Sequence, residues 1–295
     1  MPSEIIQWFP GHMAKTKRLI KESLPLVDIV IEILDARIPL SSHNPDIEKL
    51  SEGKPRLILL NKASLASPDA NSKWERYYRD LGVRCILTDC NAGTGLSSIM
   101  PTVRSILSEK LERYSAKGMS NRNLKAMVVG IPNSGKSTFI NRIAGGSKAK
   151  AENRPGVTRT QQWIRTSVGL DLLDTPGVLW PKFEDETVGE NLAATGAIKD
   201  SVLDSERIAC IICNRLRSVA KAELAARYKL TEAQIDACDT DYDLLTLIGR
   251  KRGFLISGGE IDTERAAAIV TDEFRSAKIG RITLELPSDA VAEGV

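Results

Sequence analysis

The stretch that decides the fold is residues 126–137, Ala-Met-Val-Val-Gly-Ile-Pro-Asn-Ser-Gly-Lys-Ser. Its last eight residues fit the pattern G-x-x-x-x-G-K-[ST], a glycine-rich loop whose backbone N–H groups surround phosphates. The four apolar residues before the loop predict a buried strand, and residues 137–143 predict the helix after it. This motif requires a strand on one side and a helix on the other. We therefore interpret the stretch as a phosphate-binding loop rather than a chance glycine loop.

Two further motifs of nucleotide switches accompany this loop, but their order along the chain is unusual. Residues 174–177 (Asp-Thr-Pro-Gly) supply the D-x-x-G that usually follows such a loop. Residues 61–64 (Asn-Lys-Ala-Ser) are similar to the guanine-reading N-K-x-D, yet they lie before the loop, whereas most GTPases carry that motif after it. The order predicts a circularly permuted domain, in which the chain leaves the domain directly after the D-x-x-G region.

The first part of the chain alternates short apolar runs with helical patterns, which predicts a doubly wound, mostly parallel sheet of the α/β class. Strands are expected at residues 28–34, 56–60 and 83–87, and helices at residues 71–81 and 97–114. Residues 163–168 and 170–173 predict a hairpin around Gly169, and the polar residues 116–123 predict a linker.

After about residue 183 the strand signals fade and helical patterns dominate, at residues 186–197, 204–228, 241–249 and 261–277. A short strand over residues 281–286 is expected to close this region. We therefore divide the chain into a GTPase domain at residues 1–183, a smaller and mainly helical domain at residues 184–286, and a tail at residues 287–295.

Composition limits the class of protein. The 295 residues are 42% hydrophobic and 27% charged, which is ordinary for a soluble globular protein, and the net charge of +3 permits a nucleic-acid partner without requiring one. The N-terminus lacks the pattern of a signal or transit peptide, and no apolar run approaches the roughly 20 residues that span a bilayer. A cytoplasmic protein without a membrane partner is expected. Cys210 and Cys213 form a C-x-x-C without a second pair, which favours buried packing over metal binding.

The motifs assign roles to particular side chains. The positive charge of Lys136 is expected to bind the β- and γ-phosphates, and the Ser137 hydroxyl is expected to bind Mg²⁺. Asp174 reaches the metal through water, and Gly177 gives its backbone N–H to the γ-phosphate. The phosphate-binding set is Gly130, Asn133, Ser134, Gly135, Lys136, Ser137, Thr138, Asp174 and Gly177.

A mobile switch is expected at residues 154–158 (Arg-Pro-Gly-Val-Thr), between the loop helix and the D-x-x-G strand. Thr158 is the expected Mg²⁺ ligand in it, with Thr160 as the second choice and an ordinary solvated loop as the alternative. Val178 stands where some GTPases place a water-orienting Gln, and Val cannot orient water. His12 precedes a basic amphipathic helix, and its imidazole can position water or act as a base, although a packing or partner-contact role is the alternative.

The layout resembles the YlqF/RbgA family of circularly permuted GTPases, which act in ribosome assembly. The similar residues are 8–15 (Trp-Phe-Pro-Gly-His-Met-Ala-Lys), 35–39 (Asp-Ala-Arg-Ile-Pro), 258–262 (Gly-Gly-Glu-Ile-Asp) and 278–281 (Lys-Ile-Gly-Arg). The resemblance implies a GTP- and GDP-binding domain with a helical domain that contacts ribosomal RNA. It implies late maturation of the large ribosomal subunit, with hydrolysis that is slow alone and stimulated by the subunit precursor.

The same resemblance bears on single residues. The histidine that matches His12 is proposed as catalytic in that family, and Asn133 matches an Asn that helps to hold K⁺ in related GTPases. It also turns three basic clusters, at residues 15–18, 250–252 and 275–281, from ordinary solvated surface into candidate RNA contacts. We expect the protein to be a monomer when free.

One position departs from the family pattern. Ser64 stands where the N-K-x-D motif has the Asp that accepts two hydrogen bonds from guanine. Asn61 and Lys62 can still contact the base, and Asp89 and Cys90 occupy the last base-contacting loop with a poor match to its usual Ser-Ala. Because a charge-assisted hydrogen bond contributes about 1.5–3 kcal/mol against about 1 for a neutral one, Ser64 predicts weaker GTP affinity and weaker discrimination among purines. The alternatives are a nucleotide-gated scaffold with incidental hydrolysis and a purine NTPase of relaxed specificity.

Overall fold

The computed structural model describes residues 11–119, 122–146, 161–177, 185–198 and 204–292, with the backbone alone for residues 11–16 and 291–292. Its centre is a six-stranded sheet of order β3-β2-β1-β4-β6-β5. The strands are β1 (Ile29–Asp35), β2 (Arg56–Asn61), β3 (Arg84–Leu87), β4 (Leu124–Val129), β5 (Gln162–Ile164) and β6 (Leu170–Asp174). All neighbouring pairs are parallel except β5 with β6, which form the expected hairpin.

The order of the strands confirms the predicted permutation. The phosphate loop follows β4 and the D-x-x-G strand is β6, which pairs with β4 on one side. The strand on the other side of β4 is β1, the first strand in the chain. The sheet thus begins with a strand on one side of β4 and has its last strand, which carries the D-x-x-G segment, on the other side, as expected for a domain permuted after the D-x-x-G strand.

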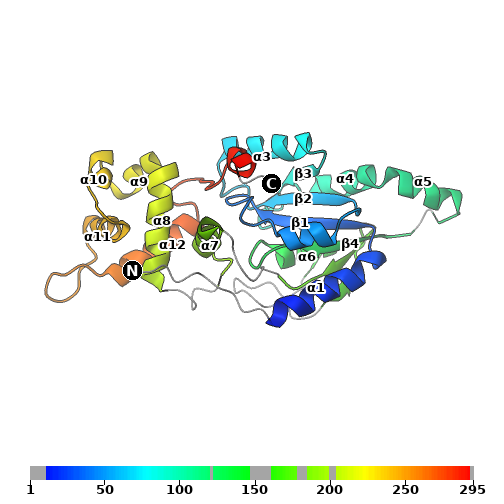
Figure 1. Ribbon diagram of the computed structural model, residues 1–295, viewed down its shortest axis with the longest axis horizontal. Helices are drawn as coiled ribbons and strands as arrows, with labels where there is room; N and C mark the ends of the chain where they lie inside the picture. The colour runs from blue at the N-terminus through cyan, green and yellow to red at the C-terminus, as the bar shows by residue number, and fades with distance from the viewer. Residues whose placement is uncertain (1–10, 120–121, 147–160, 178–184, 199–203, 293–295) are drawn as a thin grey trace.

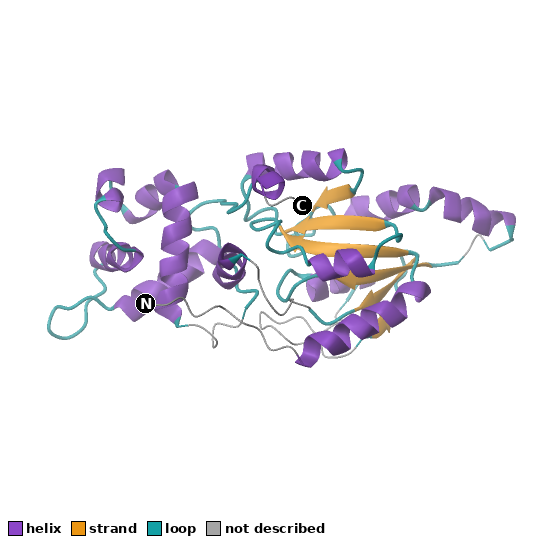
Figure 2. Cartoon of the chain, in the orientation of Figure 1, coloured by secondary structure: helices purple, strands orange, loops and turns teal. Residues whose placement is uncertain are grey.

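Helices cover both faces of this sheet because alternate strand residues point to opposite sides. Ile29, Ile31 and Ile33 of β1 face one layer, formed by α4 (Ile99–Ile106), α5 (Ser108–Ala116) and α6 (Lys136–Ala144). On the other face Val30 packs against α1 (Gly11–Ser23), η1 (Leu24–Leu26) and α2 (Pro45–Leu50), and Leu34 packs against α3 (Pro68–Asp80). Figure 2 shows the helices on the two sides of the strands.

The helix expected at residues 97–114 is interrupted. The turn η2 (Leu96–Ser98) leads into α4, and the chain bends at Leu107 (φ −101°, ψ 17°) before α5 begins. Leu107 is buried in the same cluster as Ile99 and Val103. The bend therefore keeps the apolar side chains on the sheet, which the helical period alone did not reveal.

The remaining helices form a second cluster around α8 (Ser205–Val219). The others are α7 (Glu186–Ala194), α9 (Lys221–Tyr228), α10 (Glu232–Asp236), α11 (Asp241–Arg252) and α12 (Thr263–Arg275). The helix expected over residues 204–228 breaks at Ala220 (φ −149°, ψ 44°), and α10 was not expected at all. Figure 1 shows these helices beyond the end of the sheet, with α7 next to α8 and α12.

The C-terminal residues differ from expectation. Residues 281–286 form no strand; they extend along the first domain, where the Ile282 N–H donates to Leu65 O at 3.2 Å and the Leu284 N–H to Arg37 O at 2.8 Å. Residues 287–292 were expected to be a tail but form helix α13 (Pro287–Ala292), and its Ala290 is buried with Trp74 of α3. The chain thus returns to the sheet domain, and Figure 1 shows α13 next to α3.

Candidate nucleotide-binding site

The phosphate loop joins β4 to α6, and its shape depends on two glycines. Gly130 has φ +148°, and a Cβ there would lie 2.5 Å from Ile33 O. Gly135 has φ +104° at the N-cap of α6, and a Cβ there would lie 2.1 Å from Asn61 Nδ2. Both conformations are strained for other residues, and both contacts are with groups that cannot move away. The loop therefore presents its backbone, and the start of α6, to an anion.

Lys136, the first residue of α6, is buried beneath this loop. Its Nζ donates to Ile131 O at 2.6 Å, and only 7% of the residue is exposed. Burial lowers the pKa of Lys136 to about 8, and the negative charge of Asp174 opposes that shift only in part. The folded chain thus holds a lysine whose charge is poorly solvated, at a position where phosphate oxygens would complement it.

Asp174 ends β6 and is fully buried. Neither of its carboxylate oxygens has a hydrogen bond of good geometry among the described residues, although the Gln162 side chain and the Thr175 N–H are close enough to favour the charged form. Burial raises the pKa of Asp174, and Lys136 counteracts this. A buried anion with so little compensation from the described residues is unusual and calls for a cation or its water shell. Ser137 is the second residue of α6 and offers a hydroxyl oxygen. The Asp174 carboxylate and the Ser137 hydroxyl supply only oxygen ligands, which is the kind of ligand that Mg²⁺ prefers.

Gly177 lies directly against the phosphate loop. A Cβ at this position would lie 2.9 Å from Pro132 N and 3.0 Å from Lys136 Nζ. The structure thus brings the D-x-x-G segment and the loop together, although Gly177 comes 45 positions after Pro132 in the chain. Only glycine leaves room for this approach, and it places the Gly177 backbone beside the lysine that is expected to bind the γ-phosphate.

Four of the predicted residues cannot be placed in this site. Thr158, Thr160 and Val178 lie outside the described residues, and of His12 only the backbone, in the first turn of α1, is described. Their roles stay predictions. Ser137 and Thr138 lie in the first turn of α6, as their motif requires.

Asn61 connects the phosphate loop to the base side of the site. Its Nδ2 donates to Ser134 O at 2.7 Å, and its Oδ1 accepts the Cys90 N–H at 3.0 Å. Asn61 ends β2, Ser134 belongs to the loop and Cys90 follows β3, so one buried amide fixes three loops. Cys90 contributes through its backbone, because its side chain is buried and burial raises the pKa of its thiol to about 12.

Lys62 belongs to a buried charge cluster that the sequence motifs did not reveal. Asp35 at the end of β1 accepts Lys62 Nζ at 2.9 Å and Arg37 Nη2 at 2.7 Å. Burial would raise the pKa of Asp35, but the two cations hold it far below its usual range. The D-A-R-x-P segment at residues 35–39 therefore holds the Lys62 side chain in place, and this motif was the signal in the sequence that could have pointed to the cluster.

The cluster also reaches the helical part. Arg37 Nη1 lies 3.4 Å from Arg275 O, its Nη2 lies 3.5 Å from Thr195 O, and its guanidinium stands 5.9 Å from the Phe274 ring centroid. From the loop, Asn133 Nδ2 donates to Gly196 O at 2.7 Å. Both ends of the site are thereby bonded to the segment that follows α7.

Ser64 and Asp89 contact each other at the base end. The exposed Ser64 hydroxyl donates to Asp89 Oδ2, while Asp89 Oδ1 accepts the N–H groups of Asn91 and Ala92 at 3.0 Å each. The structure thus places a carboxylate beside the serine that replaces the expected aspartate.

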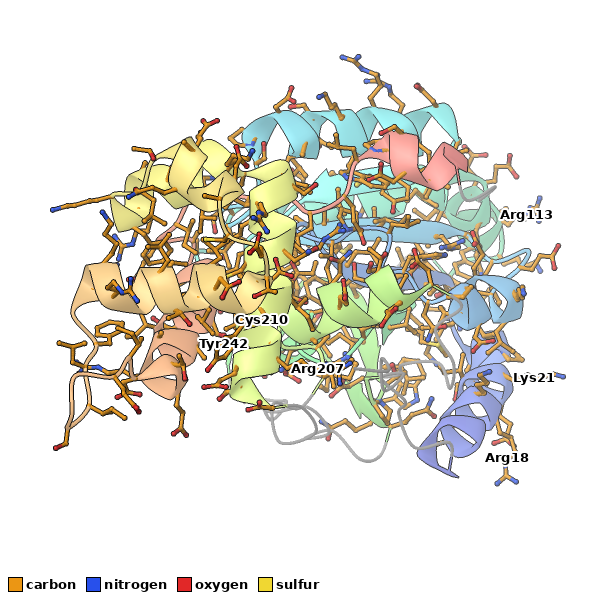
Figure 3. The ribbon with its side chains drawn as sticks, turned by 60° about the vertical axis from the view of Figure 1, so that its left-hand side comes forward. Arg18, Lys21, Arg113, Arg207, Cys210 and Tyr242 are labelled. Atoms are coloured by element: carbon orange, nitrogen blue, oxygen red, sulfur yellow. The ribbon has the colours of Figure 1, made fainter. Side chains whose placement is uncertain are left out.

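The basic clusters are only partly available for RNA. Arg275 donates to the carbonyls of Ala193 and Ala194, and Arg281 to those of Ala63 and Ala66, so this cluster serves internal bonding. Arg250 and Lys251 are exposed at the end of α11. Figure 3 shows Arg18 and Lys21 projecting from α1 away from the rest of the fold.

Other classes of site find no support in the described part of the chain. No group of three or more His, Cys, Asp and Glu there is arranged to hold a metal, and no helix there has the length and apolarity for a membrane crossing. Cys210 and Cys213 are free and lie in α8, where Cys213 is buried in the helical cluster.

Comparison with known proteins completes the description. A model of the 50S ribosome-binding GTPase family matches residues 125–238. Ribosome biogenesis GTPase A of Priestia megaterium is 48% identical over 97% of this chain and 98% of that protein, and the Thermotoga maritima protein of that name is 31% identical over 96% and 95%. The crystal structure of GNP-bound YlqF from T. maritima superposes with a TM-score of 0.62 at 28% identity, covering 92% of this chain and 98% of that one. This chain belongs to the ribosome biogenesis GTPase A (YlqF/RbgA) family.

Proposed function

We propose that this protein is a GTP-hydrolysing switch that acts in the cytoplasm in late assembly of the large ribosomal subunit. The observation that carries the proposal is the packing of Gly177 against Pro132 and Lys136, beside a buried Asp174 whose oxygens have no well-formed hydrogen bond among the described residues. A site built in this way responds to a phosphate and its cation together. The family relationship supports the ribosomal role.

In this proposal each residue has one task. The loop N–H groups and the start of α6 bind the phosphates, with Lys136 as their countercharge. Ser137, Thr158 and, through water, Asp174 would hold Mg²⁺, which neutralises charge that develops on the phosphate oxygens. The Gly177 N–H senses the γ-phosphate, and loss of that contact after hydrolysis releases the segment that follows it.

The attacking water needs a group other than residue 178, because Val178 has no polar side chain. His12 is the proposed group. The amide nitrogen of Asn133 is bonded to Gly196 O, which leaves its carbonyl oxygen as the atom that can bind a cation such as K⁺. Single-turnover hydrolysis in K⁺ and in Na⁺ tests this step; equal rates in the two salts would contradict it.

The ribosomal precursor is the proposed partner, and its RNA the proposed ligand of the helical part. Arg250 and Lys251 are exposed in the last turn of α11 and are the basic residues proposed to contact phosphates. If they do, affinity for the subunit should fall steeply with salt, and their removal should flatten that dependence.

Hydrolysis measured with and without large subunits tests the proposal as a whole. A slow basal rate that rises on addition of the subunit precursor is expected, together with co-sedimentation that depends on whether GTP or GDP is bound. Nucleotide-dependent co-sedimentation without any stimulation of hydrolysis would instead favour a nucleotide-gated scaffold, and the free protein should sediment as a monomer.

A further inference from the structure

Ser64 occupies the position of the aspartate that binds guanine in the N-K-x-D motif, and the carboxylate of Asp89 lies next to it in the fold. We propose that Asp89 supplies the missing anion, and that the Ser64 hydroxyl and the Asp89 carboxylate together read the guanine edge. This proposal rests on the function proposed above, at the same site. It reverses the expectation that guanine recognition is weakened by Ser64.

The backbone, and not only a side-chain rotamer, brings the two residues together. Ser64 follows β2 and Asp89 follows β3, and these parallel strands end at the same edge of the sheet. The Ala63 N–H donates to Thr88 O at 3.0 Å, and the Thr88 N–H donates to Leu60 O at 2.9 Å. The first of these bonds joins the residues directly before Ser64 and Asp89, so it fixes the distance between positions 64 and 89.

The Asp89 carboxylate is held in one orientation. Its Oδ1 accepts the Asn91 and Ala92 N–H groups at 3.0 Å each, and this turns Oδ2 towards Ser64. Only 8% of Asp89 is exposed. Burial would raise the pKa of Asp89, but the hydrogen bonds from Ser64 and from the Ala92 and Asn91 backbone hold it below its usual value, so the group is an anion at neutral pH.

The remaining acceptor atoms match guanine. A carboxylate accepts about four hydrogen bonds, and three are occupied, which leaves one on Oδ2. The Ser64 oxygen donates its own proton to Asp89 and keeps its lone pairs, and Ser64 is an exposed residue. The Watson–Crick edge of guanine carries two adjacent hydrogen-bond donors, N1–H and the 2-amino group, whereas adenine has no donor at N1. The Asp89 Oδ2 and the neighbouring Ser64 oxygen can therefore accept the two guanine N–H groups, and the negative charge of Asp89 strengthens these bonds. Adenine cannot make the same pair of bonds.

The competing explanation is that Asp89 only shapes its loop by accepting the Asn91 and Ala92 N–H groups. The variant Asp89→Asn separates the two, because the Asn Oδ1 still accepts both backbone N–H groups while an uncharged NH₂ faces Ser64. Asp80→Asn, at the exposed end of α3, is the matched control for the loss of one negative charge.

The first experiment is a competition titration of GTP, ITP and XTP against a fluorescent GDP analogue. With Asp89→Asn we expect GTP affinity to fall about 10- to 100-fold, the range that one charge-assisted hydrogen bond corresponds to. XTP should gain relative to GTP, because the new NH₂ can donate to the 2-carbonyl of xanthine. An unchanged ratio of GTP to XTP affinity would overturn the proposal.

The second experiment moves the carboxylate. Ser64→Asp alone creates the consensus motif but sets two carboxylates in contact, so GTP affinity should not improve and should fall about 3- to 10-fold. Combining Ser64→Asp with Asp89→Asn should restore affinity to within about 3-fold of the parent. Tighter GTP binding by Ser64→Asp alone would show that Asp89 is only a loop contact.

The two proposals fail in different ways. If the parent protein prefers GTP to ITP and Asp89→Asn keeps that preference, the role of Asp89 fails while the proposed GTPase function stands. If the parent binds no guanine nucleotide in preference to ATP, both fail. Equal unfolding midpoints of the parent, Asp89→Asn and Asp80→Asn show that altered affinity does not come from a disordered loop.

Discussion

The two ends of the nucleotide site treat charge in opposite ways. At the base end, Lys62 and Arg37 both pair with Asp35, and Asp89 accepts hydrogen bonds from Ser64 and two backbone N–H groups. At the phosphate end, Lys136 has a pKa lowered to about 8 by burial, and both oxygens of Asp174 are buried without a well-formed hydrogen bond among the described residues.

The difference in charge pairing shows which part of the site is stabilised by the protein's own residues, without a bound ligand. Ion pairs and backbone bonds stabilise the base end whether or not a nucleotide is present, so it is preformed. The phosphate end carries a buried cation and a buried anion that the fold does not fully compensate, so binding of phosphate and a metal contributes to its stability. Variants should therefore affect folding at one end and ligand binding at the other.

The largest expected effect comes from the two lysines. Lys136→Met should weaken GTP binding by about 1,000-fold, roughly 4 kcal/mol, because several phosphate oxygens share that charge. Without nucleotide its free energy of unfolding should not decrease, because a desolvated charge is removed. Titration calorimetry and urea unfolding measure the two quantities.

Lys62→Met is the matched control. It removes a partner from the buried Asp35, so unfolding without nucleotide should become easier by about 1–3 kcal/mol. If Lys136→Met and Lys62→Met lowered the free energy of unfolding equally, the base end would not be more preformed than the phosphate end.

The two buried aspartates give the next largest effect. Asp35→Asn leaves Arg37, whose side chain is 3% exposed, without its counterion, and should lower the free energy of unfolding by about 3 kcal/mol. Asp174→Asn removes a carboxylate whose pKa burial raises, and should change stability by less than about 1 kcal/mol while abolishing the dependence of GTP affinity on Mg²⁺. Chemical unfolding without nucleotide, and titrations with and without Mg²⁺, compare the two variants.

Asn61 joins the two ends, so its removal should disturb both. Asn61→Ala leaves the buried Cys90 N–H without an acceptor and frees the Ser134 carbonyl, which should cost about 2 kcal/mol of stability. GTP affinity should fall as well, because the loop loses its contact with the base side. A variant that keeps full GTP affinity while losing stability would show that the two ends act independently.

The sequence was informative where a motif fixes backbone shape. The pattern of residues 130–137 predicted the loop between a strand and a helix, and the apolar runs on either side of Gly169 predicted the hairpin of β5 and β6. Glycine spacing and apolar runs are local properties, so they can be read without the fold.

The sequence was uninformative where distant segments meet. The contact of Ser64 with Asp89, the bond of Asn133 to Gly196 O and the return of residues 281–286 to the sheet domain depend on tertiary packing. The segment 281–286 has the composition of a strand, but its N–H groups bond to the loops at Leu65 and Arg37 rather than to a strand. The internal hydrogen bonds of Arg275 and Arg281 were not foreseen for the same reason, since a charge run does not show which carbonyls lie near it.

The smallest expected effect tests whether paired charges stabilise the fold away from the site too. His43 contacts Glu32 at 3.0 Å and Glu48 at 3.1 Å. Burial alone would lower the pKa of His43, but the two carboxylates raise it to about 10. A raised pKa means that the folded state binds the proton more tightly than the unfolded state, so the stabilisation is complete below about pH 6.5 and is lost as the pH rises through 10. His43→Gln should therefore lower the free energy of unfolding by about 1–2 kcal/mol at pH 6. The difference from the parent, measured by urea unfolding at pH 6, 8 and 10, should shrink with pH; a constant difference would mean that His43 acts by packing and not by its charge.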